Sequence, residues 1–157
     1  LSVPDVVADF VPLLQTAAGA GYPIAFTRDP GPAKVLIDRG SLERAVLNLV
    51  LNARDAMPAG GAIGVHVAPD RTAEAGGPDG AYVRVDVRDA GTGIPEADRE
   101  RIFEPFYTTK APGKGTGLGL AVVRRVVDRA GGFIRVDSPP GEGTTFRLYF
   151  PRVSGEG

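Results

Sequence analysis

Three polar side chains recur at helical spacing within an apolar stretch of the chain. Residues 40–57 are apolar nearly all round, yet Asn48, Asn52 and Asp55 follow one another at intervals of four and three residues. This spacing puts them on one side of an α-helix. A buried amide must find hydrogen-bond partners, so the two asparagines either cap neighbouring loops or face a ligand. An amide oxygen suits Mg²⁺, which in proteins also keeps waters and phosphate oxygens as ligands.

A second pattern, Asp-x-Gly-x-Gly, directly follows a stretch of alternating apolar residues. It is formed by Asp89, Gly91 and Gly93. The pattern fits a tight turn, and it also fits a pocket for a nucleotide base. An ionised carboxylate only accepts hydrogen bonds and so suits the exocyclic amine of adenine, while the two glycines let the backbone approach a ring closely.

A third pattern is a glycine-rich run that opens a helix, made of Gly115, Thr116, Gly117, Leu118, Gly119 and Leu120. Free backbone N–H groups and the dipole at a helix start favour phosphate. The run is not a dinucleotide-binding fingerprint, because its third glycine is misplaced and a loop precedes it. It is not a P-loop either, because Gly115 rather than Ser or Thr follows Lys114. The run alone therefore indicates only an anion-binding helix start.

Between the second and third patterns lies the segment 103–110, which combines aromatic and basic residues. Phe103 and Phe106 are suited to anchor a loop, while Lys110 and Lys114 are long enough to reach a phosphate. The same residues also fit an aromatic pair that plugs the core beside solvated lysines.

These residues need a scaffold, and the pattern of apolar residues predicts an α+β fold. Segments 62–68 and 81–87 alternate between apolar and polar residues, which predicts an antiparallel pair of strands with one exposed face. The whole chain, 1–157, is predicted to form one two-layer α/β sandwich with helices on one face of a mixed sheet. The other expected elements are helices 2–19, 40–57, 95–103 and 118–130, strands 22–27, 33–37, 133–137 and 144–150, loops 70–80 and 104–116, and a frayed tail from 152.

Composition narrows the functional classes. A net charge of −1 with interspersed acids and bases argues against a nucleic-acid surface. No apolar run approaches the roughly 18 residues of a membrane span, and no basic segment marks a signal peptide. The absence of cysteine excludes disulfides and thiolate metal sites, and it fits a cytoplasmic protein. Because the sequence does not begin with Met, we expect it to be part of a longer protein.

The four patterns, taken in order, resemble the N, G1, F and G2 boxes of the catalytic, ATP-binding domain of bacterial two-component sensor histidine kinases. They stand at 48–57, 89–93, 103–110 and 115–120, and the segment 143–146 is similar to the last strand of that family. The resemblance covers essentially the whole chain. It implies the Bergerat ATP-binding sandwich, which is shared with DNA gyrase, mismatch-repair and heat-shock chaperone ATPases.

The resemblance also implies roles for individual residues. Asn52 matches the ligand of Mg²⁺, Asn48 would lie beside the phosphates, and these two are the expected catalytic residues. Asp89 matches the residue that recognises adenine, and residues 108–114 would form a short lid over ATP. The other residues implied in binding ATP are Asp55, Gly91, Gly93, Ile94, Thr109, Lys110, Lys114, the run from Gly115 to Leu120, and Thr144.

The function implied is transfer of the γ-phosphate of Mg-ATP to a histidine on a separate dimerisation domain, with a response regulator reached through the parent protein. His66, within a predicted strand, is expected to be a surface residue rather than the phosphoacceptor. Gyrase-type and chaperone-type ATPases are the main alternative; they carry a Glu base where this chain has Asn48, which cannot accept a proton at neutral pH. An anti-sigma-factor serine kinase and a non-catalytic nucleotide sensor are further alternatives, the latter requiring broken boxes that this sequence lacks.

Overall fold

A computed structural model of the protein describes residues 1–71, 80–91, 93–94, 97, 102–103, 119–139 and 141–153. In chain order its elements are α1 (Val3–Ala18), β1 (Ile24–Arg28), α2 (Arg39–Asp55), β2 (Ile63–Arg71), β3 (Ala81–Asp89), α3 (Gly119–Arg129), β4 (Phe133–Asp137) and β5 (Thr144–Pro151).

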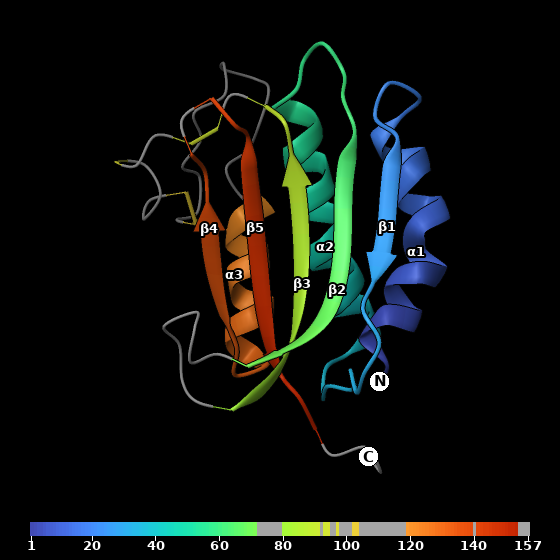
Figure 1. The fold of residues 1–157 in the computed structure, drawn as a ribbon, viewed down its shortest axis with the longest axis vertical. Helices are drawn as coiled ribbons and strands as arrows, with labels where there is room; N and C mark the ends of the chain where they lie inside the picture. Colours follow the sequence, from blue (N-terminus) through green and yellow to red (C-terminus); the bar gives the residue numbers. More distant parts are fainter. Residues whose placement is uncertain are drawn as a thin grey trace.

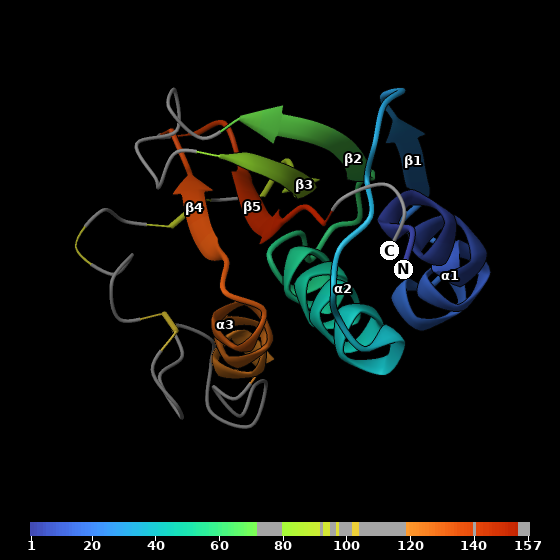
Figure 2. The same ribbon diagram turned by 90° about the horizontal axis from the view of Figure 1, so that it is seen from below.

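The strands form one mixed sheet with the order β1-β2-β3-β5-β4 (Figure 1). β1 runs parallel to β2, and the other neighbouring pairs are antiparallel. Helices α1, α2 and α3 cover one face of this sheet (Figure 2), so the predicted two-layer α+β sandwich is confirmed. Because β5 pairs with β3, the start of β5 lies beside the end of β3, and Thr144 is the register partner of Asp89.

The core lies between the sheet and the helices. Alternate residues of the central strands point toward the helices, and Val65, Val85 and Leu148 are all fully buried there. Leu42 and Leu49 of α2 are buried from the other side. Burying a side chain of this size stabilises a fold by about 1.5–3 kcal/mol. This packing fixes α2 against the sheet, and α2 carries the asparagines that the sequence singled out.

α2 begins one residue before its predicted start, at a side-chain cap. Asp38 is the N-cap residue, and its carboxylate accepts a hydrogen bond of 2.9 Å from the backbone N–H of Ser41. Such a cap satisfies one of the free N–H groups of the first turn and stabilises a helix by about 1 kcal/mol. At the other end Ala56 caps α2, and Pro58 follows it.

Two predictions about local structure were wrong. Residues 33–37 form no strand but two isolated bridges, in which Lys34 pairs with Ser2 and Val35 with Arg152. The tail also does not fray at residue 152, since the backbone N–H of Arg152 donates to Ala81 and that of Val153 donates to Lys34. Both ends of the chain thus hold this segment, an arrangement that no local pattern reveals.

Several other predictions lie wholly or mainly outside the described residues. These are the helix 95–103, the loop 104–116 and the tail beyond 153. The polar loop expected at 70–80 begins later than predicted, because β2 continues to Arg71.

The face of the sheet opposite the helices carries charged side chains. Arg84 donates to the carboxylates of Asp86 and Asp70, with N–O distances of 2.9 and 2.7 Å. Burial raises the pKa of Asp86, and the charge of Arg84 partly opposes this. On the same face His66 lies 2.6 Å from the hydroxyl of Thr27. This position agrees with the expected place of His66 on a strand with an exposed face.

Within the described residues, no helix combines the length and the apolar character needed to cross a bilayer.

Candidate functional site

The C-terminal end of α2 lies at the end of the sandwich where β3 and β4 finish and β5 begins (Figure 1). Asn48 and Asn52 are half-buried on this helix. Asp55 follows near the end of the helix, where its carboxylate pairs with Arg54 at 3.2 Å. α2 therefore carries two amides of intermediate exposure and one carboxylate along the half of the helix that leads to this end of the molecule.

Asn48 also contacts the start of α3. A Cβ atom placed on Gly119, the first residue of that helix, would lie 3.6 Å from Oδ1 of Asn48. The amide of Asn48 therefore lies close to Gly119, the first residue of α3. The next residue, Leu120, is half-buried and packs against the core, which anchors this end of α3.

The turn after β3 packs tightly on the end of α2. A Cβ atom on Gly91 would lie 2.4 Å from the carbonyl oxygen of Ala56, well inside van der Waals contact. Only a residue without a side chain fits there, so Gly91 is required by close approach of two backbones. This contact joins the Asp-x-Gly-x-Gly turn to the helix that carries Asn48 and Asn52.

Asp89 is a buried carboxylate at the base of this turn, with 3% of its surface exposed. Its Oδ1 accepts a hydrogen bond of 2.8 Å from the backbone N–H of Gly91, and the carboxylate also accepts one from the backbone of Thr144. Burial raises the pKa of Asp89, and these two hydrogen bonds partly offset the effect. A carboxylate kept this dry, with acceptor capacity remaining, is suited to bind a donor from a ligand.

A serine that sequence reasoning missed completes the buried polar group. In the part of the chain that the structure describes, the buried polar and charged residues are Asp89, Ser138 and Thr144. The hydroxyl of Ser138 accepts a hydrogen bond of 2.8 Å from the backbone N–H of Ile94 and lies 2.9 Å from the hydroxyl of Thr144. Ser138 thus connects the turn after β3 to the start of β5.

Ser138 gave no distinct signal in the sequence. It follows the predicted strand 133–137 and precedes a proline, which is the composition of an ordinary turn. Its role depends on the pairing of β3 with β5, which brings residues more than 40 positions apart into contact. The glycines around it fit this packing, since a Cβ atom on Gly93 would lie 3.0 Å from the Ser138 hydroxyl and one on Gly143 would lie 2.1 Å from the carbonyl oxygen of Asp89.

The structure therefore brings predicted site residues together in two groups: Asn48 lies close to Gly119, and Asp89, Gly91, Gly93, Ile94 and Thr144 surround the turn after β3. Asn52 lies on α2, four residues after Asn48. Asp55 and Leu120 lie on the same two helices, α2 and α3. The remaining predicted site residues lie outside the described residues: Thr109, Lys110, Lys114, Gly115, Thr116, Gly117 and Leu118.

Comparison with known proteins places this geometry in a family. The family model described as "Histidine kinase-, DNA gyrase B-, and HSP90-like ATPase" matches residues 37–154. The chain belongs to this family. The match spans every site residue named above, from α2 to β5.

Within the family the relatives are sensor kinases. The chain is 44% identical to sensor kinase CckA of Brucella abortus (strain 2308), over 98% of this chain and 17% of that protein. Among solved structures, mycobacterial sensor histidine kinase MprB superposes with a TM-score of 0.76 at 29% identity, covering 97% of this chain and 95% of that one. Full-length ShkA in complex with AMPPNP also gives a TM-score of 0.76, at 31% identity, covering 98% of this chain and 30% of that one.

These matches confirm the prediction of a histidine kinase catalytic domain rather than one of the other branches of the family. The chain spans only 17% to 28% of the length of the first three curated relatives it matches.

Proposed function

We propose that this domain binds Mg-ATP at the end of the sandwich formed by α2, the turn after β3 and the start of β5. In the parent protein it would supply the γ-phosphate to a histidine on a separate dimerisation domain. The observation that carries the proposal is the buried carboxylate of Asp89, held by Gly91 and Thr144 beside the polar side of α2.

Asp89 suits the base of the nucleotide. Its carboxylate already accepts hydrogen bonds from two backbone N–H groups, and a carboxylate has about four acceptor positions. The free positions fit the exocyclic amine of adenine, whereas guanine presents a carbonyl at the equivalent place. Loss of one hydrogen bond to a charged group costs about 1.5–3 kcal/mol, which corresponds to roughly 10- to 150-fold in affinity.

The polar side of α2 suits the phosphates and their metal. An asparagine oxygen is a hard donor, and Asn52 would hold Mg²⁺ together with phosphate oxygens and water. When bound, Mg²⁺ neutralises charge on the phosphates. Asn48 lies against Gly119 at the start of α3, where backbone N–H groups favour an anion. The sequence adds Thr109, Lys110, Lys114 and residues 115–118 as further proposed phosphate contacts.

The same side of α2 favours phosphoryl transfer over hydrolysis. Asn48 occupies the position one turn before Asn52, and an amide cannot act as a general base for water. A histidine from the dimerisation domain would therefore be the nucleophile, placed in line with the γ-phosphate. We further propose that the parent protein passes the phosphoryl group to a response regulator and that this domain works in the cytoplasm. ShkA, a structural neighbour, was solved with AMPPNP, an imido analogue of ATP, which supports a nucleotide ligand.

The test is an incubation with γ-labelled ATP. We expect the chain alone to bind ATP, to hydrolyse it very slowly and to retain no stable label. Adding the dimerisation domain of the parent protein as a separate chain should label the histidine of that domain, weakly because the tether is lost. Stable label on this chain alone would indicate a self-sufficient kinase. Rapid hydrolysis by it would indicate an ATPase of the gyrase or chaperone type.

A further inference from the structure

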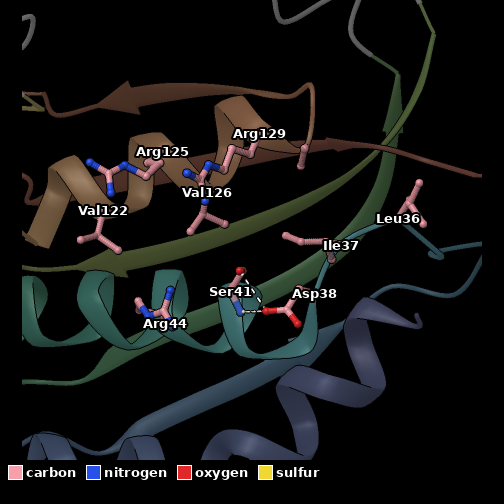
Figure 3. Close-up of a pocket in the computed structure, with 10 residues that line it drawn as sticks. Leu36, Ile37, Asp38, Ser41, Arg44, Val122, Arg125, Val126 and Arg129 are labelled. Carbon is pink, nitrogen blue, oxygen red and sulfur yellow. Dashed lines mark hydrogen bonds between the residues drawn. The ribbon is translucent and has the colours of Figure 1, made fainter.

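A groove of about 420 Å³ lies between the N-terminal end of α2, with the residues just before it, and α3 from Val122 onward (Figure 3). It is a different place from the proposed nucleotide site, because none of the residues that line it is among the site residues named above. It extends along α3 to Arg129, ten residues from Gly119, or about 15 Å at 1.5 Å per residue. Val122 and Val126 point into it from α3 (Figure 3). Leu36 lies at its rim with 84% of its surface exposed.

The rim of the groove is positively charged. Arg44 of α2 and Arg125 and Arg129 of α3 line it, against a single acid, Asp38. That acid is already engaged, since its carboxylate accepts hydrogen bonds from the backbone and hydroxyl of Ser41. Among the described residues none of the three arginines has an ion-pair partner. The neighbouring Arg124, by contrast, pairs with Asp128.

These features fit an amphipathic acidic partner better than a free anion. The start of α2 is capped by Asp38, so a carboxylate already occupies the place where an anion would meet the helix N-terminus. A small anion would also leave the half-buried Val122 and the exposed Leu36 uncovered. A partner that carries both apolar and acidic side chains would cover the apolar floor and neutralise the arginines.

We propose that this groove docks an acidic amphipathic helix of a second protein. The groove runs between two helices, and an apolar ridge on a third helix fills such a groove with side chains spaced three and four residues apart. Arg125 and Arg129 are one helical turn apart, so carboxylates at i and i+4 of the docked helix would meet them. Arg44 would meet a carboxylate on its opposite flank. A helix held here would restrain α3, whose first residue lies close to Asn48, so docking would reach the proposed nucleotide site through α3.

The probe is a synthetic 20-residue helical peptide with leucines at i, i+3, i+4 and i+7 and glutamates on both flanks. A second peptide has lysine at every glutamate position. Binding of each fluorescently labelled peptide to the whole chain is measured by anisotropy at two salt concentrations. We expect saturable, salt-sensitive binding of the glutamate peptide and at least tenfold weaker binding of the lysine peptide.

Matched variants locate the binding. Arg125→Glu should weaken the glutamate peptide at least tenfold and allow the lysine peptide to bind, a gain that misfolding cannot produce. Arg124→Glu makes the same charge change one residue away, outside the groove, and should leave both affinities unchanged. Leu36→Ser should weaken binding of the glutamate peptide a few-fold. ATP affinity of the free chain should be the same in all three variants, so this proposal can fail without the proposed ATP site failing.

Any of four results would overturn the proposal. The first is no saturable binding of the glutamate peptide, and the second is binding that Arg125→Glu leaves intact. The third is displacement of the peptide by inorganic phosphate at equal concentration, which would make the groove a simple anion site. If the chain instead forms a dimer in sedimentation and Arg125→Glu abolishes it, a second copy is the occupant and the partner helix is excluded.

Discussion

Replacing Gly91 by alanine tests how the turn after β3 is held against α2. The added Cβ would lie 2.4 Å from the carbonyl oxygen of Ala56 and 2.9 Å from its Cβ. An ordinary carbon–oxygen contact is about 1 Å longer than the first of these distances. The obstacle is helix-end backbone rather than a flexible side chain, so the turn must move away from α2.

The size of the effect follows from this displacement. Overpacking of this kind costs about 1–3 kcal/mol of stability. Moving Gly91 also disturbs its 2.8 Å hydrogen bond to Asp89, and a hydrogen bond to a charged group is worth about 1.5–3 kcal/mol. We therefore expect Gly91→Ala to lower the free energy of unfolding by about 1–3 kcal/mol and to weaken ATP binding by roughly tenfold or more.

Gly21→Ala is the matched control, because a Cβ atom there would meet nothing within 4 Å. That substitution should leave ATP affinity unchanged and stability unchanged or slightly higher. The assays are urea unfolding followed by circular dichroism, and calorimetric titration with Mg-ATP. If Gly91→Ala matched Gly21→Ala in both assays, the close contact between the turn and α2 would have no energetic consequence, and the reasoning would be refuted.

Three further predictions concern the neighbouring polar residues. Asn52→Ala should abolish the Mg²⁺-dependent part of ATP affinity while adenosine still binds; calorimetry with and without Mg²⁺ checks this, and an unchanged Mg²⁺ dependence would exclude Asn52 as the ligand. ATP binding needs ionised Asp89, whose pKa is raised by burial. The apparent Kd for ATP should therefore be constant above this pKa and rise about tenfold per pH unit below it, and the rise should start at a higher pH than it would for an exposed Asp. If the Asp89→Asn variant showed the same pH profile, the effect would belong to another group. Ser138→Ala removes the acceptor for the N–H of Ile94 and a hydrogen-bond partner of Thr144. This change should lower the free energy of unfolding by about 1–3 kcal/mol and weaken ATP binding, which urea unfolding and calorimetry measure. An unchanged ATP affinity would mean that Ser138 stabilises the fold but does not support the nucleotide site.

The sequence predicts the parts of this structure that depend on local periodicity. The spacing of apolar and polar residues predicts both the helix that carries Asn48 and Asn52 and the alternating strand that ends at Asp89. Contacts between segments that are distant in the chain are not indicated by such spacing. The polar link through Ser138 exists only because β5 pairs with β3.

The two wrong predictions have the same origin. The segment around Val35 is apolar enough to suggest a strand, but it finds only single bridge partners, one of them Arg152. The sequence also did not indicate the groove beside α3, because its walls come from two helices that are separated by two strands in the chain. The residues proposed for the lid and for most of the phosphate loop remain predictions from sequence.

The central claim is that the domain is an ATP site built around Asp89 and Asn52, and one calorimetric experiment tests it directly. The chain is titrated with ATP and with GTP, each with and without Mg²⁺. We predict saturable binding of ATP that strengthens with Mg²⁺, and GTP binding that is at least tenfold weaker. Equal affinities for ATP and GTP, or no saturable binding of either nucleotide, would contradict the account.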